Sequence, residues 1–319
     1  MKKVLITGAS GFAGSFLSEY LISKKNYEVY GTYLTDSSLD NLKKIKDEIH
    51  PVKIDLTNVD ETGKVISEIK PEMVFHLAAF PSPADSFKNP SRTIYNNLAA
   101  QINILEAIKN NKLTDTKILI VSSAEIYGLI KYSDLPIDED TSYKPTSPYA
   151  VSKLSQDFLG LQYYISYKLK IIRVRPFNHI GPRLSPSFAA SSFARRIAEI
   201  EKRGKEAVLY VGNLKAKRDF TDVRDMVRAY QMILENGEIG DVYNIGSGKS
   251  YEISFILDKL LSFTDKKIKI QVDPKLLRPN DTPEFRCDNK KIVDVTGWHA
   301  EIPIETSLKD TLDYWRNII

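Results

Sequence analysis

A turn with three regularly spaced glycines, placed between an apolar strand and a helix, limits the fold of this chain more than any other feature. Lys3-Val-Leu-Ile-Thr7 runs directly into Gly8-Ala-Ser-Gly11-Phe-Ala-Gly14, and a helix-like segment follows over Ala13–Ser23. Glycine lets the backbone turn tightly and come close to a ligand, and the N-terminus of a helix favours the charge of a pyrophosphate. In this context the pattern predicts a dinucleotide site that includes Gly8, Gly11, Phe12 and Gly14. A tight turn without a ligand is the alternative.

Apolar runs and amphipathic stretches alternate through the first half of the chain. We expect strands at Val4–Ile6, Glu28–Thr32, Val52–Ile54, Met73–His76, Lys117–Ser122 and Lys170–Val174. Between them, helices are expected at Ala13–Ser23, Val59–Ile69, Ser91–Lys109 and Pro148–Tyr167. This alternation predicts an α/β fold, namely a doubly wound parallel sheet of the Rossmann type with helices on both faces.

The regular alternation of expected strands and helices ends after Arg175, where Pro176, Gly181, Pro182 and Pro186 lie close together. A chain of 319 residues is also long for one compact core. We therefore expect two closely joined domains. The NAD(P)-binding domain would comprise residues 1–174 and about 219–247, and a smaller C-terminal substrate domain would comprise about 175–218 and 248–319.

Charge and cysteine content exclude several classes of function. The net charge of +4 arises from 45 basic and 41 acidic residues that are mixed along the chain, so we expect no nucleic-acid or membrane surface. Met1-Lys-Lys precedes too few apolar residues for a signal peptide or a membrane span. Cys287 is the single cysteine, which excludes an internal disulfide and fits a reducing compartment. We expect a cytoplasmic protein.

Three side chains predict a proton-transfer centre. Ser123 follows the apolar run Ile118-Leu-Ile-Val121, while Tyr149 and Lys153 lie four residues apart on the next expected helix and so share one face. A tyrosine hydroxyl has a pKa near ~10, and a nearby ammonium, aided by the positive nicotinamide of an oxidised cofactor, would lower it. The tyrosine could then exchange a proton with a substrate oxygen while a hydride moves at the carbon. Ser123 would hydrogen-bond the same oxygen at the ligand-binding edge of the sheet. Alone, a Tyr-x-x-x-Lys pair is usually a surface feature.

Other positions are expected along the path of the dinucleotide. Asp55 and Leu56 follow the third strand, where Asp55 either contacts the adenine or serves only as a turn residue. Ala78 and Ala79 give small side chains where a cofactor would pass the edge of the sheet. The choice between NAD and NADP is open, because Asp36 stands slightly late after the second strand and no arginine is present there.

These motifs together resemble the extended short-chain dehydrogenase/reductase family, whose members act on nucleotide sugars. The resemblance covers nearly the whole chain and is carried by Thr7-Gly8-Ala-Ser-Gly11-Phe-Ala-Gly14, Phe75-His-Leu-Ala-Ala79, Ser122-Ser-Ala-Glu-Ile-Tyr127-Gly128 and Ser147-Pro-Tyr149-Ala-Val-Ser-Lys153. It implies a catalytic set of Ser123, Tyr149 and Lys153, with Lys153 also holding the nicotinamide ribose of NAD(P)H. It also implies a homodimer packed through two helices of each subunit, expected at Ser91–Lys109 and Pro148–Tyr167.

Segments of the second half are similar to the GDP-mannose branch of that family. They are Arg175-Pro-Phe-Asn-His-Ile-Gly-Pro182, Val211-Gly-Asn-Leu-Lys-Ala-Lys-Arg218-Asp-Phe-Thr-Asp-Val-Arg-Asp225 and Leu277-Arg-Pro279. The resemblance implies a GDP-sugar held by Asn178, Arg218 and Arg278, and arginine forks suit phosphate oxygens. As alternatives, Asn178 caps a turn, Arg218 pairs with a neighbouring aspartate, and Arg278 only precedes a proline turn.

Within this branch the residues are most similar to reductases that convert the C4 keto group of GDP-4-keto-6-deoxy-D-mannose to give GDP-D-rhamnose. The main alternative is 4,6-dehydration of GDP-mannose, because Glu125 stands two residues beyond Ser123, where dehydratases keep a glutamate. Dehydratases usually carry threonine in place of Ser123 and an arginine-bearing loop after the second strand. Reductases of this branch can also carry the glutamate, so Glu125 joins the expected catalytic set without deciding the reaction. A 4-epimerase and a non-catalytic nucleotide-binding protein are further alternatives.

Overall fold

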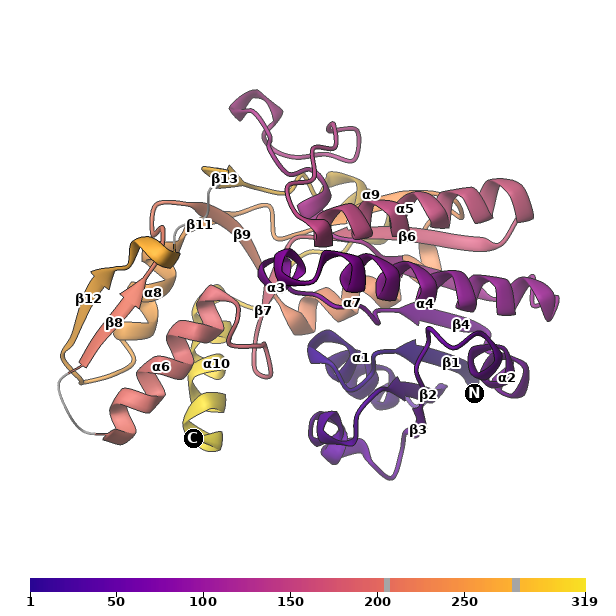
Figure 1. Ribbon diagram of the computed structural model, residues 1–319, viewed down its shortest axis with the longest axis horizontal. Coiled ribbons are helices and arrows are strands. Elements are labelled where there is room, and N and C mark those ends of the chain that lie inside the picture. Colours follow the sequence, from indigo (N-terminus) through magenta and orange to yellow (C-terminus); the bar gives the residue numbers. More distant parts are fainter. Residues whose placement is uncertain (204–206, 277–281) are drawn as a thin grey trace.

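A parallel sheet forms the centre of the larger part of the molecule (Figure 1). The computed structural model describes residues 1–203, 207–276 and 282–319, and within them this sheet has seven strands in the order β10-β6-β5-β4-β1-β2-β3. The strands are β1 (Lys2–Thr7), β2 (Tyr27–Tyr33), β3 (His50–Lys53), β4 (Met73–His76), β5 (Lys117–Val121), β6 (Lys170–Pro176) and β10 (Val242–Ile245). The strand order reverses on either side of β1, and such a switch point creates a crevice at the carboxyl ends of the strands.

Helices cover both faces of this sheet. One face carries α2 (Val59–Ile69), α4 (Pro90–Asn110) and α5 (Pro148–Tyr167), and the other carries α1 (Phe12–Ser23), α7 (Val223–Asn236) and α9 (Lys290–Thr296) (Figure 1). Alternate residues of β1 point to opposite faces: Val4 and Ile6 pack under α1 and α7, whereas Leu5 packs under α2 and α4. Because both faces are buried, the strands read as continuous apolar runs.

A smaller part of the molecule has its own sheets and core. Strand β9 (Lys217–Asp222) pairs with β7 (Asn178–Ile180), β11 (Ser250–Glu252) and β13 (Glu284–Phe285), and β8 (Ala207–Val211) pairs with β12 (Ile268–Val272). Helices α6 (Ala189–Arg203), α8 (Ile253–Leu261) and α10 (Ile304–Ile318) pack on them around a separate apolar cluster (Figure 1). The described residues also form the helices η1 (Asp36–Ile45), α3 (Pro83–Lys88), η2 (Ala124–Ile126), η3 (Tyr132–Asp134) and η4 (Pro274–Leu276).

The α/β fold expected from the sequence is confirmed, and the helices at Val59–Ile69 and Pro148–Tyr167 begin and end where the pattern places them. Helix α5 begins at Pro148 because Ser147 accepts a hydrogen bond from the backbone N–H of Ala150, and it ends where Lys168 turns left-handed. The limits of the two expected domains stay a prediction. In the described part of the chain, none of the helices has the length and apolarity that crossing a membrane requires.

Candidate active site

A cavity of about 800 Å³ opens at the carboxyl ends of the central strands. Its walls come from the glycine turn after β1, the ends of β2, β4 and β5, the start of α5, strand β7 and helix α6. Open parallel sheets bind their ligands in this position. The cavity therefore receives side chains from both the central sheet and the smaller part of the molecule.

The glycine turn presents bare backbone to this cavity. Gly8 has a φ of +68°, a conformation that residues with a Cβ rarely adopt. A Cβ on Gly14 would lie 2.2 Å from the carbonyl oxygen of Gly8, so the turn could not keep its shape with any other residue there. Gly11 donates its N–H to the Gly8 carbonyl at 3.0 Å and precedes α1 as its N-cap. The turn and the helix N-terminus thus form a cradle suited to phosphate groups.

Ser123, Tyr149 and Lys153 all line this one cavity. Tyr149 lies in the first turn of α5 and is 8% exposed, while Lys153 lies one turn later and is 4% exposed. The Lys153 ammonium donates to the carbonyl of Val121 at 2.8 Å, and the Ser122 hydroxyl donates to the Lys153 carbonyl at 3.1 Å. These bonds fix α5 against the end of β5, so the helix and the strand bring the three side chains together.

Burial dominates the electrostatics of Tyr149 in the protein alone. Burial raises the pKa of Tyr149 well above its usual value, and although hydrogen bonding with Ser123 works in the opposite direction, the Glu125 carboxylate raises it further. Burial also lowers the pKa of Lys153 to about 7. The lowering of the Tyr149 pKa that was expected from an ammonium together with an oxidised nicotinamide stays a prediction for the loaded site. In the protein alone, burial favours the neutral phenol, which is the form that can give a proton away.

Two histidines lie near these residues in fixed, apolar positions. Burial, with the nearby charge of Lys153, lowers the pKa of His76 to about 3, and its Nδ1 lies 2.9 Å from the Thr7 hydroxyl. Burial also lowers the pKa of His179, whose ring stacks on Phe12 with centroids 5.5 Å apart. Both imidazoles are neutral and pack the walls of the site. Phe12, expected at the cofactor, lines the cavity through this stack.

The remaining cofactor positions predicted from the sequence line the same cavity: Asp55, Leu56, Ala78 and Ala79. One oxygen of Asp55 accepts from the backbone N–H of Thr57 at 2.9 Å and from its hydroxyl at 2.7 Å. Asp55 thus has the turn role that was one of its two interpretations, and it faces the cavity as well. The N–H of Ala78 donates to the Thr7 hydroxyl oxygen at 3.0 Å, which holds this segment over the glycine turn.

The expected substrate residues come from the smaller part of the molecule. Asn178 on β7 and Arg218 on β9 line the cavity, and the Arg218 guanidinium donates to the carbonyls of Lys217 and Thr282, each at 2.8 Å. Arg278 lies outside the residues that the structure describes. Glu125 also lines the cavity, beside Ser123, and its N–H donates to the Ser123 hydroxyl oxygen at 3.2 Å.

The side chains that line the cavity without having been predicted include those of Arg183, Arg196 and Tyr230. Arg183 donates to Glu19 at 2.6 Å and to Ser15 at 3.0 Å, so it ties the loop after β7 to helix α1. Arg196 from α6 and Tyr230 from α7 also reach the cavity. The sequence around Tyr230 shows only the apolar spacing of a core-facing helix, which does not distinguish this residue from its neighbours.

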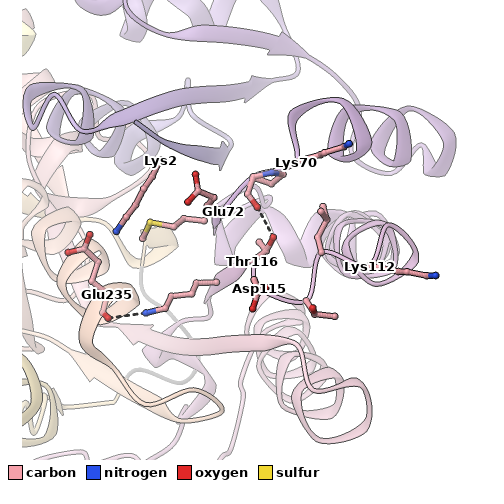
Figure 2. A pocket seen from close by; sticks show the side chains of 12 residues that line it. Lys2, Lys70, Glu72, Lys112, Asp115, Thr116 and Glu235 are labelled. Atoms are coloured by element: carbon pink, nitrogen blue, oxygen red, sulfur yellow. Dashed lines mark hydrogen bonds between the residues drawn. The ribbon is translucent and has the colours of Figure 1, made fainter.

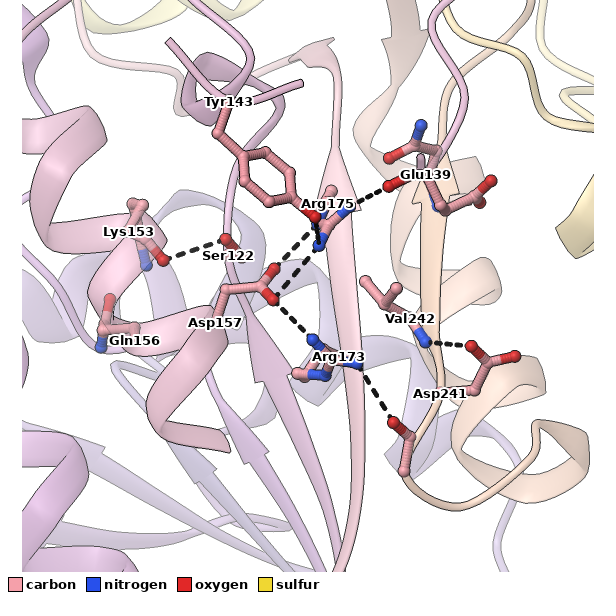
Figure 3. Close-up of polar contacts among 12 residues, drawn as sticks. Ser122, Glu139, Tyr143, Lys153, Gln156, Asp157, Arg173, Arg175, Asp241 and Val242 are labelled. Carbon is pink, nitrogen blue, oxygen red and sulfur yellow. Dashed lines mark hydrogen bonds and ion pairs between the residues drawn. The ribbon is translucent and has the colours of Figure 1, made fainter. Parts of the chain in front are cut away.

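A buried ion cluster holds α5 on the sheet (Figure 3). Asp157 lies one turn after Lys153 and accepts from Arg173 Nη1 at 2.8 Å and from Arg175 Nε at 2.9 Å. Arg175 also donates to the hydroxyls of Tyr127 and Tyr143, each at 2.9 Å. The cluster fixes the axial position of α5, and with it the placement of Tyr149 and Lys153.

A second pocket, of about 620 Å³, lies at the opposite end of the sheet (Figure 2). Lys70 and Lys112 extend away to one side of it, and Lys117 is bound to the backbone carbonyl of Glu235 at 3.0 Å. It has no residue of the expected catalytic set. Among the described residues, no cluster of three or more His, Cys, Asp or Glu side chains is placed to hold a metal ion.

Comparison with known proteins yields one family and a consistent set of relatives. The model of a family described as GDP-mannose 4,6 dehydratase matches residues 5–311. A GDP-6-deoxy-D-mannose reductase of Pseudomonas aeruginosa is 34% identical over 316 residues, covering 99% of this chain and 98% of the relative. A GDP-mannose 4,6-dehydratase of Yersinia enterocolitica is 30% identical and covers 96% of this chain and 91% of the relative.

Solved structures agree with these relatives. The structure of RMD from Pseudomonas aeruginosa complexed with NADPH has a TM-score of 0.88 and 32% identity, with full coverage (100%) of both chains. A UDP-glucose 4-epimerase from Thermotoga maritima, solved with UDP-glucose, has a TM-score of 0.87 and 27% identity, with 99% of each chain covered.

Proposed function

The chain belongs to the GDP-mannose 4,6-dehydratase family, and on that premise we propose that it reduces the C4 keto group of GDP-4-keto-6-deoxy-D-mannose to give GDP-D-rhamnose, with NAD(P)H as the reductant. The observation that carries the proposal is that Tyr149 lies buried beside Ser123 in the cavity that also has the glycine cradle, where burial raises the pKa of its phenol. A reduction needs a proton donor at the carbonyl oxygen, and this phenol is one.

The residues of the cavity fit a dinucleotide. A Cβ on Gly14 would collide with the carbonyl oxygen of Gly8, and a Cβ on Gly8 would lie 3.1 Å from Cα of Ala78. Glycine at these two positions therefore leaves the part of the cavity beside the turn free of side chains. Gly8, Gly11, Phe12 and Gly14 would hold the pyrophosphate end, and Asp55, Leu56, Ala78 and Ala79 would border the adenosine and the passage beyond. When bound, a reduced nicotinamide supplies a hydride to a carbonyl carbon.

The side chains of this protein have separate tasks in the proposed reaction. Tyr149 donates its phenolic proton to the O4 oxygen, because burial keeps that proton on the phenol until charge develops on the substrate. Ser123 hydrogen-bonds the same oxygen and orients it. Lys153 has three N–H donors, of which Val121 takes one, and the others would hold a ribose and offset the tyrosinate that forms. Asn178, Arg218 and Arg278 would bind the GDP-sugar.

The experiment is turnover of purified protein with GDP-4-keto-6-deoxy-D-mannose and NADPH or NADH, followed by loss of reduced nicotinamide and by the mass of the product. Tyr149→Phe should lower kcat by about 10²–10⁴-fold while cofactor binding stays nearly unchanged. Tyr132→Phe is the matched control, because Tyr132 is exposed and does not line the cavity. Wild-type turnover by Tyr149→Phe would refute the role of this residue.

A second candidate function is 4,6-dehydration of GDP-mannose, which Glu125 favours. Its carboxylate is close enough to raise the pKa of Tyr149, and dehydration needs a base for the C5 proton. GDP-mannose offered to the protein separates the two reactions: loss of water without net consumption of cofactor supports the dehydratase. Glu125→Gln should abolish that reaction and affect C4 reduction much less.

We also propose that two copies of the chain pack through α4 and α5. These adjacent helices carry exposed apolar side chains on their outer surface, including Tyr95, Phe158 and Ile165. Burying them against the same helices of a second copy would remove this apolar surface from water.

The single free cysteine, Cys287, supports a cytoplasmic location for the proposed reaction.

A further inference from the structure

We infer that Asp219, a buried carboxylate outside the cavity, is a positioning residue that holds Arg218 in place to bind the diphosphate of a guanosine nucleotide. The inference rests on the proposed function, because it takes Arg218 to be a ligand of the GDP-sugar. It gives a task to a side chain that is not among the described residues lining the cavity.

Asp219 and Arg218 are neighbours on β9, so their side chains leave opposite faces of the strand. Arg218 lines the cavity, whereas Asp219 is 0% exposed. One carboxylate oxygen of Asp219 accepts from the backbone N–H of Ser247 at 2.9 Å and from its hydroxyl at 2.6 Å. The other oxygen accepts from the N–H of Gly248 at 2.9 Å and from the N–H of Cys287 at 3.1 Å. These hydrogen bonds engage both carboxylate oxygens within the protein.

The donors lie at the ends of the two strands that flank Arg218. In the smaller sheet Arg218 pairs with Tyr251 of β11 on one side and with Phe285 of β13 on the other. The turn that leads into β11 donates two backbone N–H groups to Asp219, and the chain just after β13 donates a third. Asp219 therefore fastens both neighbouring strands to the strand that carries Arg218.

The placement of the Arg218 guanidinium depends on one of these strands. It donates to the carbonyl of Thr282, at 2.8 Å, in the segment that leads into β13. The same segment is held on β9 by the bond from the N–H of Lys217 to the carbonyl of Pro283, at 2.7 Å, and by the pairing of β13. If Asp219 released the end of β13, the carbonyl that orients the guanidinium would move with the strand. Groups that bind a ligand need such support, because a displaced side chain bonds the ligand less well.

Two substitutions disturb these contacts without changing the Arg218 side chain. Asp219→Asn keeps the size of the side chain, but its amide group donates where an oxygen accepted, so at least one buried N–H group loses its acceptor. Gly246→Ala acts through packing alone, because its Cβ would lie 2.6 Å from Cβ of Cys287 and 3.0 Å from Asp219 Oδ2. Both variants should therefore loosen the two strands beside Arg218.

Calorimetric binding of GDP and of NADPH to the full chain tests this inference. Asp219→Asn should weaken GDP binding about tenfold or more, while NADPH binding stays within about twofold of the wild type. Gly246→Ala should weaken GDP binding in the same way, and it decides the outcome if Asp219→Asn does not fold. Arg218→Met should also weaken GDP binding. Adding Asp219→Asn to Arg218→Met should then weaken it little further, because the carboxylate acts through the guanidinium.

Asp225→Asn is the matched control. Asp225 is 2% exposed, and one of its oxygens accepts from the backbone N–H groups of Glu301 and Ile302 at 2.9 and 2.8 Å. These bonds tie α7 to the segment before α10 and not to the strands beside Arg218. Asp225→Asn should therefore lower the midpoint of thermal unfolding, as Asp219→Asn does, but keep the GDP affinity of the wild type.

Unchanged GDP binding by Asp219→Asn would overturn the inference, as would a parallel loss of NADPH binding or an equal loss of GDP binding in Asp225→Asn. Additive losses in the double variant would overturn it as well, and so would a wild-type protein that does not bind GDP. None of these measurements requires turnover. A protein that shows the expected pattern but does not reduce the keto sugar would contradict only the proposed reaction.

Discussion

Replacing Asp157 by asparagine should destabilise the protein strongly, because it removes the one carboxylate between two buried guanidinium groups (Figure 3). Asp157 is 0% exposed and Arg175 is 1% exposed, so solvent cannot take over the lost interaction. The carboxylate accepts hydrogen bonds from Arg173 and Arg175 at 2.8–2.9 Å. The substitution keeps the shape of the side chain and removes its charge.

The magnitude follows from what each arginine retains. Removing one partner of a buried ion pair costs about 3–5 kcal/mol, since the other charge is left uncompensated. Arg175 keeps two tyrosine hydroxyls and the carbonyl of Glu139 as acceptors, and the asparagine amide oxygen still accepts one bond. We therefore expect the lower end of the range, about 3 kcal/mol. With a urea m value of about 3 kcal/mol per molar, the unfolding midpoint should fall by about 1 M.

Urea unfolding, followed by circular dichroism, measures this change. Asp115→Asn is the control, because Asp115 forms a shorter ion pair, 2.6 Å to Lys170, while its side chain is 94% exposed. Its midpoint should not move measurably, since solvent and salt screen an exposed pair. If Asp157→Asn left the midpoint where it is in the wild type, or if both variants moved it equally, the argument that burial makes this cluster stabilising would be wrong.

Three other substitutions test the turn, the ammonium and the helical surface. Gly14→Ala should abolish nucleotide binding, measured by calorimetry, because its Cβ would lie 2.2 Å from the backbone of the turn, and retained binding would contradict this close approach. Gly63→Ala, on open helix surface, should instead raise the free energy of unfolding by about 0.5–1 kcal/mol, measured by thermal unfolding. The pKa of Lys153 is about 7 in the folded protein, below its ordinary value of 10.5. Between these two pH values the unfolded chain binds one more proton than the folded protein. The free energy of unfolding should therefore rise with pH across this window. Lys153→Met should weaken that rise, and parallel curves for variant and wild type would count against it. Phe158→Asp should convert the proposed dimer to a monomer in light scattering, unlike Val295→Asp on α9, and an unchanged mass would exclude an interface through α5.

Short-range patterns predicted six of the seven strands that the described residues place in the central sheet, and they missed β10. The helix from Pro148 to Tyr167 follows from a serine cap, a proline in the first turn and apolar spacing, all of which are local. The third strand differs slightly, since β3 covers His50–Lys53 and not Val52–Ile54. Pro51 is tolerated within it because β3 is at the edge of the sheet, where a missing N–H costs no ladder bond.

Features that depend on contacts between distant segments could not be predicted. The hydrogen bond between Ser10 and Ser38 and the ion pair between Asp36 and Lys53 both require the packing of η1 and β3 against the glycine turn. The direction of the Tyr149 pKa depends on how deeply the cavity floor is buried, which no motif encodes. A sequence motif names the reacting groups, but their protonation is set by the three-dimensional surroundings.

The position of β10 has a consequence for synthesis of the chain on the ribosome. This strand covers one edge of β6, yet it is made only after residues 177–241. Until then β6 is an unpaired edge in an apolar sheet, and Tyr127 lacks the Asn244 side-chain oxygen that its hydroxyl donates to in the finished protein. A nascent or truncated chain that stops before Val242 should therefore associate with other chains or with chaperones, because its sheet remains open to intermolecular strand pairing.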